Sequence, residues 1–324
     1  MHKHCFEVVD RSLRDVLTPY DERNKYIHFG GKVVVFCGDF RQILSVIHKG
    51  TRQAVVNATI NSSKICIEDR DDVDITLRIP DDVLISSSND LIASIVTVIY
   101  PSILDNMKHP SFFHDRVILT PKNSIVDLIN EYMLLLIDDD ENVHLRYDSP
   151  NNDNSGFDKP DDIHTPEFLN TIVCSGLPNH KLILKFGVSV MLLRNIDPAH
   201  GLCNETRLIV TKMRQFIIEG NIISESNICD KVFIPGLSLT PSNIKIPFKF
   251  QCWQFPIVVS FAMTINKSQG QSLKNVGVYL PQSVFSHGQL YIVVSRLTLR
   301  NGLKILIVDD NENLTNTTSK VVYK

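Results

Sequence analysis

Hydrophobic and polar positions follow two different periods along this chain. Phe6, Val9 and Leu13 recur at helical spacing, and Pro19 follows as a stop, which predicts an amphipathic helix over residues 4–17. The next apolar run, residues 33–36, is short, β-branched and bounded by glycines. It predicts a buried strand of a parallel sheet, with residues 39–42 in the loop at its C-terminal end.

A second strand and helix are predicted further along the chain. Val117-Ile118-Leu119 forms the expected strand, Pro121 ends it, and Ser124 is the expected cap of a helix that runs to Ile137. After Leu177 the pattern changes to short β-like runs separated by Gly and Pro turns, which predict a small barrel or sheet. These runs are residues 182–186, 188–193, 207–213, 221–223 and 231–234.

Strand, helix and strand return in the last part of the chain. A strand is predicted over residues 257–263, a short helix over 265–269 closed by Gly270, and two further strands over 276–280 and 303–308. The pattern as a whole predicts an α/β fold with a small β module inserted into it.

Residues 138–167 interrupt this pattern with ten acidic and two basic residues, three prolines and an Asn-Asn-Asp-Asn-Ser-Gly stretch. Such a composition is typical of a solvated loop that need not fold. The alternative of a metal-dependent hydrolase that uses these carboxylates is disfavoured, because they lack the histidine spacing of a metal site. No metal ligands are predicted.

Composition narrows the class without naming a function. The 324 residues are 43% hydrophobic and 21% charged, as in ordinary globular proteins of about two domains, and the formal net charge is −3. A nucleic-acid site must therefore be local. The seven scattered cysteines indicate reduced thiols. Without a signal-peptide pattern or a long apolar run, an intracellular location is expected.

Three segments carry candidate chemistry. Gly38, Asp39 and Gln42 follow the predicted strand at the sheet edge where open α/β sheets bind ligands, although a Gly-Asp turn is also common structure. The segment from Thr264 to Gly270 gathers hydroxyl, cation and amide groups at a helix start, which favours phosphate but also suits a capped surface helix. Arg296 ends an apolar helical stretch. Two interpretations stay open, an arginine finger that points into a cleft and a residue that solvates the helix end.

Together, and in this order, the three segments resemble motifs III, V and VI of superfamily-one DNA helicases of the RecD-like branch. The surrounding sequence is similar to the Pif helicases of plant genomes and Helitron transposons, notably residues 29–42, 113–123, 177–181, 190–195 and 261–296. The acidic segment is the least similar part.

The resemblance implies two RecA-like domains, a small SH3-like insert, and an ATP- and Mg²⁺-dependent helicase that moves 5′ to 3′ on single-stranded DNA. It implies that Gln42 and Arg296 are catalytic and contact the γ-phosphate, and that Thr264, Asn266, Lys267 and Ser268 hold the DNA backbone. The nucleotide-binding residues it implies are Gly38, Asp39, Gln42, Gln269, Gly270 and Arg296. Lys122 and Arg194 are weaker candidates. A nuclear location and a role in repair, recombination, telomeres or Helitron transposition are also expected.

Several features depart from the family pattern. The chain contains no G-x-x-x-x-G-K-[ST] sequence, and the Asp-Glu pair of the family would fall before Met1, so we expect a fragment that lacks Walker A and B. The sequence is also short around Ser62-Ser63-Lys64, where relatives complete the first domain. Asn266 stands where many relatives carry His, and Glu205 interrupts an Asn-Gly turn.

The expected organisation is a partial first RecA-like domain over residues 1–82 and a second one over 83–176 and 255–310, with the SH3-like insert at 177–254 and a tail at 311–324. A helicase fragment is the first functional hypothesis. The alternative is a non-catalytic, single-stranded DNA-binding remnant of a transposon helicase. No stable protein partner and no membrane contact are expected.

Overall fold

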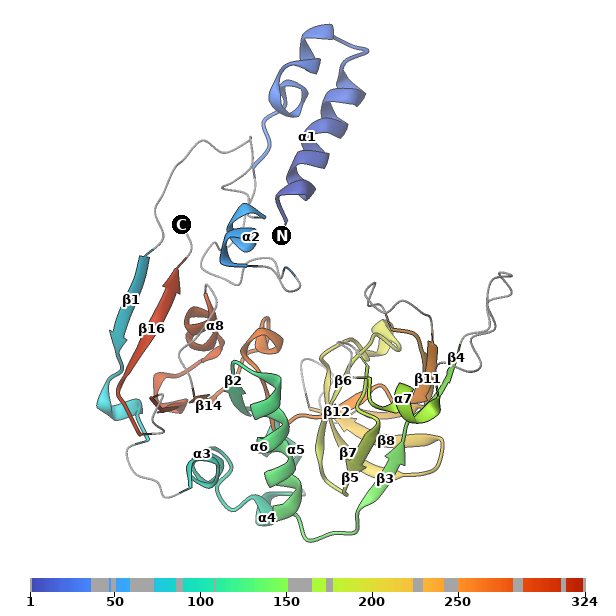
Figure 1. Ribbon diagram of the computed structural model, residues 1–324, viewed down its shortest axis with the longest axis vertical. Helices are drawn as coiled ribbons and strands as arrows, with labels where there is room; N and C mark the ends of the chain where they lie inside the picture. The colour runs from blue at the N-terminus through green and yellow to red at the C-terminus, as the bar shows by residue number, and fades with distance from the viewer. Residues whose placement is uncertain are drawn as a thin grey trace.

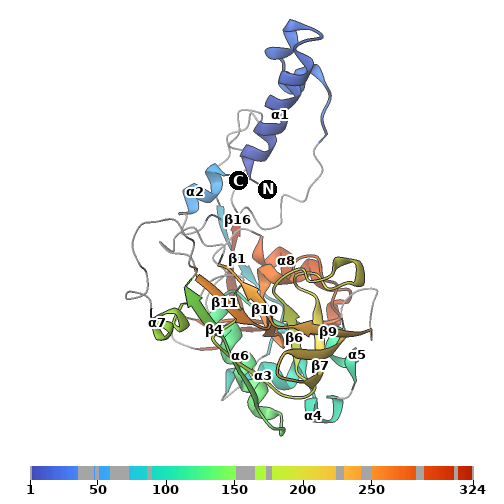
Figure 2. The same ribbon diagram turned by 90° about the vertical axis from the view of Figure 1, so that its right-hand side faces the viewer.

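The computed structural model describes residues 2–35, 47, 51–58, 73–85, 90–107, 109–150, 165–172, 177–223, 230–241, 250–281, 288–309 and 313–322. In these residues a parallel sheet with helices on both faces lies beside antiparallel sheets, which confirms the predicted α/β class (Figure 1). Figure 2 shows the same arrangement from the side.

The parallel sheet has the strand order β13-β2-β14-β15. These strands are Ala262–Thr264, Arg116–Thr120, Asn275–Leu280 and Leu303–Ile307. Alternate side chains of β2 enter different cores, because successive residues of a strand point to opposite faces. Ile118 packs in the core that contains α3 (Leu91–Ile99) and α6 (Asn123–Leu136), and Val117 and Leu119 pack in the core that contains α8 (Gln289–Arg296). Two short helices, α4 (Ile103–Asn106) and α5 (Pro110–His114), precede β2.

The small β module is a five-stranded antiparallel sheet in the order β12-β6-β7-β8-β9. Its strands are Ile257–Val259, Ser189–Leu192, Arg207–Met213, Ile217–Ile222 and Lys231–Pro235. Two smaller antiparallel sheets adjoin it, β10-β11-β4 (Leu237–Leu239, Phe250–Gln254, Tyr147–Pro150) and β3-β5 (Asn142–Leu145, Lys181–Leu184). The single strand predicted over 257–263 is wrong: β12 belongs to the antiparallel module and β13 to the parallel sheet. A continuous apolar run carries no signal for such a change of partner.

The amino-terminal part forms the predicted helix, α1 (Lys3–Leu17), which projects away from the sheets in Figure 1. It packs against two short 3₁₀ helices, η1 (Glu22–Lys25) and η2 (His28–Gly31). The Asp10 carboxylate accepts a hydrogen bond from Phe29 N at 2.5 Å and pairs with Arg14. A further helix, α2, covers Arg52–Asn57.

The strand predicted over residues 33–36 is wrong for its described part, residues 33–35. Residues 32–35 have no strand pairing, and the side chains of Val33 and Val35 are 93% and 77% exposed. A strand of a parallel sheet needs backbone partners on its neighbours, and the four-stranded sheet described here offers none to this segment. Its β-branched composition alone does not supply them.

The acidic segment and the expected tail both contain strands, contrary to prediction. Residues 142–145 and 147–150 form β3 and β4, and α7 (Pro166–Asn170) begins before the segment ends. The tail contains β16 (Thr317–Val322), which pairs antiparallel with β1 (Val73–Arg78). A short 3₁₀ helix, η4 (Asp81–Val83), follows β1.

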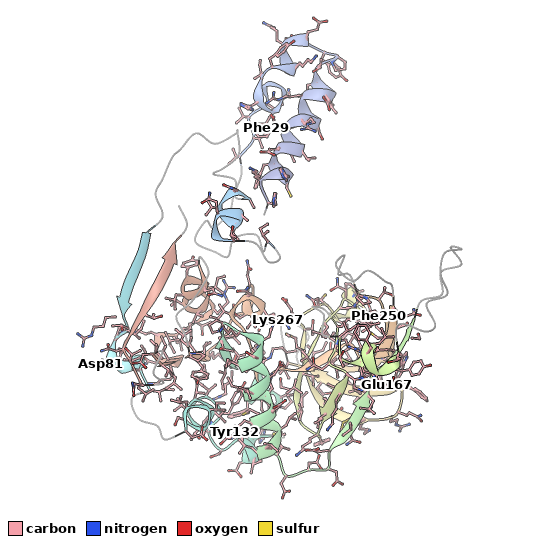
Figure 3. The ribbon with its side chains drawn as sticks, viewed as in Figure 1. Phe29, Asp81, Tyr132, Glu167, Phe250 and Lys267 are labelled. Carbon is pink, nitrogen blue, oxygen red and sulfur yellow. The ribbon has the colours of Figure 1, made fainter. Side chains whose placement is uncertain are left out.

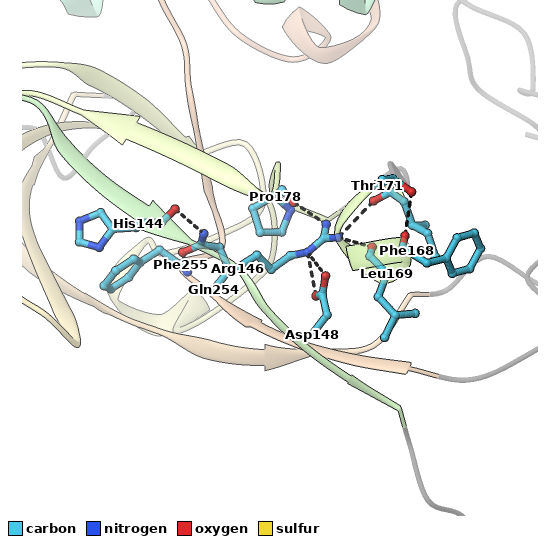
Figure 4. Close-up of polar contacts among 10 residues, drawn as sticks. His144, Arg146, Asp148, Phe168, Leu169, Thr171, Pro178, Gln254 and Phe255 are labelled. Carbon is cyan, nitrogen blue, oxygen red and sulfur yellow. Dashed lines mark hydrogen bonds and ion pairs between the residues drawn. The ribbon is translucent and has the colours of Figure 1, made fainter. Parts of the chain in front are cut away.

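Arg146 explains why the acidic segment folds at its amino-terminal end (Figure 4). Its Nε donates to both carboxylate oxygens of Asp148, at 2.8 and 3.0 Å, and its Nη atoms donate to backbone carbonyls at the end of α7 and at Pro178. Both side chains of the ion pair are buried. A buried pair of this kind is stable only when its remaining donors are satisfied, and here carbonyls from two other segments satisfy them.

Candidate nucleic-acid interface

The segment from Thr264 to Gly270 leaves the C-terminal end of β13. Thr264 lies beside Thr120 of β2 in the parallel register, and the 3₁₀ helix η8 (Ile265–Ser268) follows at once. Ile265 is fully buried and anchors this turn, and Gly270 ends it with φ +89°. Asn266, Gln269 and Gly270 are exposed and Lys267 is half-buried, so this turn presents its cation and amides at the sheet edge.

Ser268 does not share this outward orientation. Its side chain is fully buried, and its hydroxyl donates to the Ile265 carbonyl at 2.7 Å. The hydroxyl therefore satisfies the backbone of the turn. Of the four residues predicted to hold DNA, Ser268 is the one whose geometry gives the prediction no support, and we assign it the role of shaping η8.

Lys267 lines a pocket of about 580 Å³, named here the Lys267 pocket, between the parallel sheet and the small β module. The sheet side contributes Thr264 and Asp127 of α6, and the module contributes Glu205 from the loop between β6 and β7. In Figure 3, Lys267 lies where these two parts face each other. The pocket thus joins a cation to two carboxylates.

Burial is the largest cause of the shifted pKa values of Lys267, Asp127 and Glu205. It lowers the pKa of the Lys267 ammonium, and the Glu205 and Asp127 carboxylates oppose that change by favouring the charged form. Burial raises the pKa of the Asp127 and Glu205 carboxyl groups. Repulsion from Glu131 raises the pKa of Asp127 further. In both carboxyl groups the charge of Lys267 acts in the opposite direction.

Gln269 and Gly270 line a second pocket of about 360 Å³, named here the Gln269 pocket. Asn204 and Glu205 line both pockets. The buried Arg207 also lines the Gln269 pocket and donates to the carbonyls of His114 and Arg116, at 3.5 and 3.1 Å. The predicted nucleotide-binding amide and the predicted DNA-binding cation thus line different pockets, which share one loop of the small module.

Arg296 ends α8, whose Ile292 and Val293 pack in the same core as Ile265. Its carbonyl accepts from Leu273 N at 2.9 Å, so the end of α8 is tied to the chain that follows Gly270. Its guanidinium donates to Ser295 Oγ at 2.9 Å, and it lines neither the Lys267 pocket nor the Gln269 pocket. The two predicted motifs are neighbours, but the arginine is directed elsewhere.

The remaining candidates are less informative. Gly38, Asp39 and Gln42 lie outside the described residues, as does the segment around Ser62-Ser63-Lys64. Lys122 is exposed next to the start of α6. This helix begins one residue before the predicted cap Ser124. Arg194 donates to Thr240 O at 3.1 Å.

Asp127 was missed by the sequence analysis, because an acid near the start of a helix is usually solvated.

Of the predicted nucleotide-binding residues, Gln269, Gly270 and Arg296 lie among the described residues. The described residues contain no cluster of three His, Cys, Asp or Glu residues that would hold a metal ion, and the only γ-phosphate candidate among them is Arg296. Nor does any helix in the described ranges have the length and apolar character needed to cross a membrane.

The parallel sheet, its flanking helices and the adjoining antiparallel module form an α/β fold of the RecA-like kind. Residues 1–72 match the family model of the PIF1-like helicases, and residues 167–213 match that of the 2B domain of the DNA helicase Pif1. These two segments are thus similar to the Pif family of DNA helicases, and together they cover less than half of the chain.

Individual relatives agree with this assignment. The chain is 25% identical to the ATP-dependent DNA helicase PIF1 of Danio rerio over 328 residues, which cover 98% of this chain and 46% of that protein. It is 32% identical over 150 residues to the Xenopus laevis protein of the same name, covering 44% of this chain and 22% of the relative. The chain thus spans less than half the length of these relatives.

Solved structures agree on the fold. A Bacteroides Pif1 bound to single-stranded DNA matches with a TM-score of 0.53 and 21% identity over 94% of this chain and 68% of that one. A Pif1 helicase described in unwinding forked DNA matches with a TM-score of 0.54, also at 21% identity, over 94% of this chain and 66% of the other. At this identity the likeness concerns the fold alone.

Proposed function

We propose that this chain is the single-stranded DNA-binding part of an ATP-dependent 5′–3′ DNA helicase, and that the Lys267 pocket holds the DNA backbone. The observation that carries the proposal is the position of Lys267, at the C-terminal edge of the parallel sheet and facing the small β module. Ligands of open α/β sheets bind at this edge. That a Pif1 relative of similar fold is described as bound to single-stranded DNA supports it.

The charge of the pocket predicts the strength of this binding. One half-buried ammonium between two carboxylates attracts phosphate only weakly, and the chain as a whole carries a net charge of −3. We therefore expect weak, salt-dependent affinity for single strands, without the steep salt dependence of a basic surface. Thr264 and Asn266 would add neutral hydrogen bonds to the phosphates.

Fluorescence anisotropy with a labelled oligonucleotide tests this proposal. Lys267→Ala should weaken binding severalfold and make the logarithmic salt slope shallower by roughly 0.7, the contribution of one neutralised phosphate on a single strand. Lys25→Ala, which removes an exposed lysine of η1, is the matched control and should change neither quantity. Equal binding by the Lys267 variant and the wild type would contradict the proposal.

The second candidate is a DNA-binding chain that does not hydrolyse ATP. The absence of a G-x-x-x-x-G-K-[ST] sequence from these 324 residues favours it. Both candidates share the Lys267 pocket, and they differ only in whether binding is coupled to hydrolysis. A nuclear setting in repair, recombination, telomere maintenance or Helitron transposition belongs to the same proposal.

A further inference from the structure

Glu205 has a backbone conformation that its side chain does not favour. Its φ is +71°, in the left-handed region, which non-glycine residues occupy uncommonly. Thr206 N donates to Cys203 O at 3.1 Å, so Glu205 is the third residue of a four-residue turn. A positive φ at this place is typical of a type II turn, which prefers glycine or asparagine there. The loop therefore holds a carboxylate where backbone geometry favours a residue without one.

The surrounding hydrogen bonds fix this conformation. Glu205 N donates to Leu192 O at 2.9 Å, and Asn204 N donates to Asn195 Oδ1 at 2.7 Å. Thr206 Oγ1 accepts from Cys203 N and donates to the Gly201 carbonyl. Strained residues that persist because their surroundings over-determine them occur preferentially at functional sites.

The position of Glu205 indicates what that function is. Its half-buried side chain lines both the Lys267 pocket and the Gln269 pocket. A DNA strand that passes from one pocket to the other must therefore pass this carboxylate. Lys267 from η8 and Asp127 from α6 face the same space, and His114 of α5 lines the Gln269 pocket. Among these groups Lys267 is the cation that attracts Glu205.

We propose that Glu205 competes with the DNA phosphate for Lys267 and so holds the affinity of this interface below the value that its cation would give. This inference rests on the proposed DNA-binding function and concerns its regulation by one residue of the small β module. A phosphate that reaches Lys267 must overcome the attraction between Lys267 and Glu205 and the repulsion from the carboxylate. The hydrogen bonds of the turn fix the Glu205 backbone, so the carboxylate moves only by rotation of its own side chain.

Two substitutions at this position separate charge from backbone strain. Glu205→Gln removes the charge and keeps the side-chain shape, whereas Glu205→Gly also relieves the positive φ. Both should tighten single-stranded DNA binding by roughly three- to tenfold, the effect of removing one like charge close to the phosphate. Glu205→Gly should in addition raise the melting temperature. Tighter binding by the glycine variant alone would overturn the proposal, because the backbone would then be the cause.

A double variant tests whether Glu205 acts through Lys267. The gain from Glu205→Gln should disappear in the Lys267→Ala background, because the two side chains act as a pair. Glu22→Gln, at an exposed position of η1, is the matched control for loss of one carboxylate and should leave affinity unchanged. An equal gain with and without Lys267 would overturn the proposed competition.

A measurement without DNA keeps this inference separate from the proposed function. The pKa of the Lys267 ammonium, followed by nitrogen-resolved NMR of the lysine side chains, should fall in Glu205→Gln because the neighbouring negative charge is lost. An unchanged pKa would overturn the inference whatever the DNA results are. If the pKa falls and no variant binds DNA, the proposed function is overturned and with it the competition for phosphate.

Discussion

At the scale of single residues, the two carboxyl groups of the Lys267 pocket make DNA affinity depend on pH. Burial raises the pKa of both Asp127 and Glu205, so each becomes neutral at a higher pH than an exposed carboxyl group. Below these raised values the pocket loses its negative charge while Lys267 stays protonated. Affinity for single-stranded DNA should therefore rise as the pH falls through them, and level off once both groups are neutral.

Anisotropy titrations over a pH series measure this dependence at constant ionic strength. The wild type should gain affinity towards low pH, and Asp127→Asn combined with Glu205→Gln should remove most of the gain. The two proteins differ only at these two positions, so the difference between the two curves reports the two carboxyl groups. Parallel curves would contradict the assignment of the pH dependence to this pocket.

At the scale of elements, close packing of α3 on the parallel sheet depends on a glycine in β14. A Cβ atom added at Gly277 would lie 2.6 Å from Ile99 Cγ1 and 3.1 Å from Ile95 Cγ1, both on α3. Gly277→Ala should therefore push the helix from the sheet and lower the free energy of unfolding by about 1–3 kcal/mol. Urea denaturation followed by circular dichroism measures this loss.

A variant of Ile99, on α3, tests whether contact with this helix causes the loss of stability in Gly277→Ala. Ile99→Ala alone should destabilise by about 2–5 kcal/mol because it leaves a cavity. In the Gly277→Ala background its effect should be clearly smaller, because the added methyl group occupies part of the space that the isoleucine leaves. Additive losses would show that Gly277 is required for a reason other than contact with α3.

The elements were predictable where local pattern and tertiary partners agree. The period of 3.6 predicts α1 and α6, and the β-branched runs around 207–213 and 303–308 predict β7 and β15. Prediction failed where a tertiary partner determines whether a segment folds. Residues 33–35 have strand composition but no strand partner among the described residues, and the acidic segment folds at its start because Arg146 pairs with Asp148.

The candidate site was predictable only in part, for a related reason. A local sequence motif pointed to Thr264 and Lys267, but the inward rotation of Ser268 depends on a hydrogen bond to Ile265 that spacing does not predict. The carboxylates opposite Lys267 come from α6 and from the small β module, far away in the sequence. No pattern along the chain reports that these segments meet.

At the scale of the whole molecule, we predict that the 324-residue chain binds DNA without hydrolysing ATP. Phosphoryl transfer depends on positioning and charge stabilisation by a phosphate-binding loop, its lysine and Mg²⁺. The sequence contains no such loop, and Arg296 donates to its neighbour Ser295. A phosphate-release assay with and without single-stranded DNA should therefore show only background turnover. DNA-stimulated turnover that Arg296→Ala abolishes would contradict this prediction and favour the complete enzyme.

The pairing of β1 with β16 sets an order of events during synthesis of the chain. β1 ends at Arg78 and β16 begins at Thr317, so β1 leaves the ribosome long before its partner exists. A two-stranded ribbon is marginal by itself, and closing so long a loop is entropically costly. The ribbon therefore cannot form until the end of the described chain has been synthesised. Until then β1 lacks this partner, and an unpaired strand backbone can pair with another chain, so the interval before β16 emerges carries a risk of aggregation.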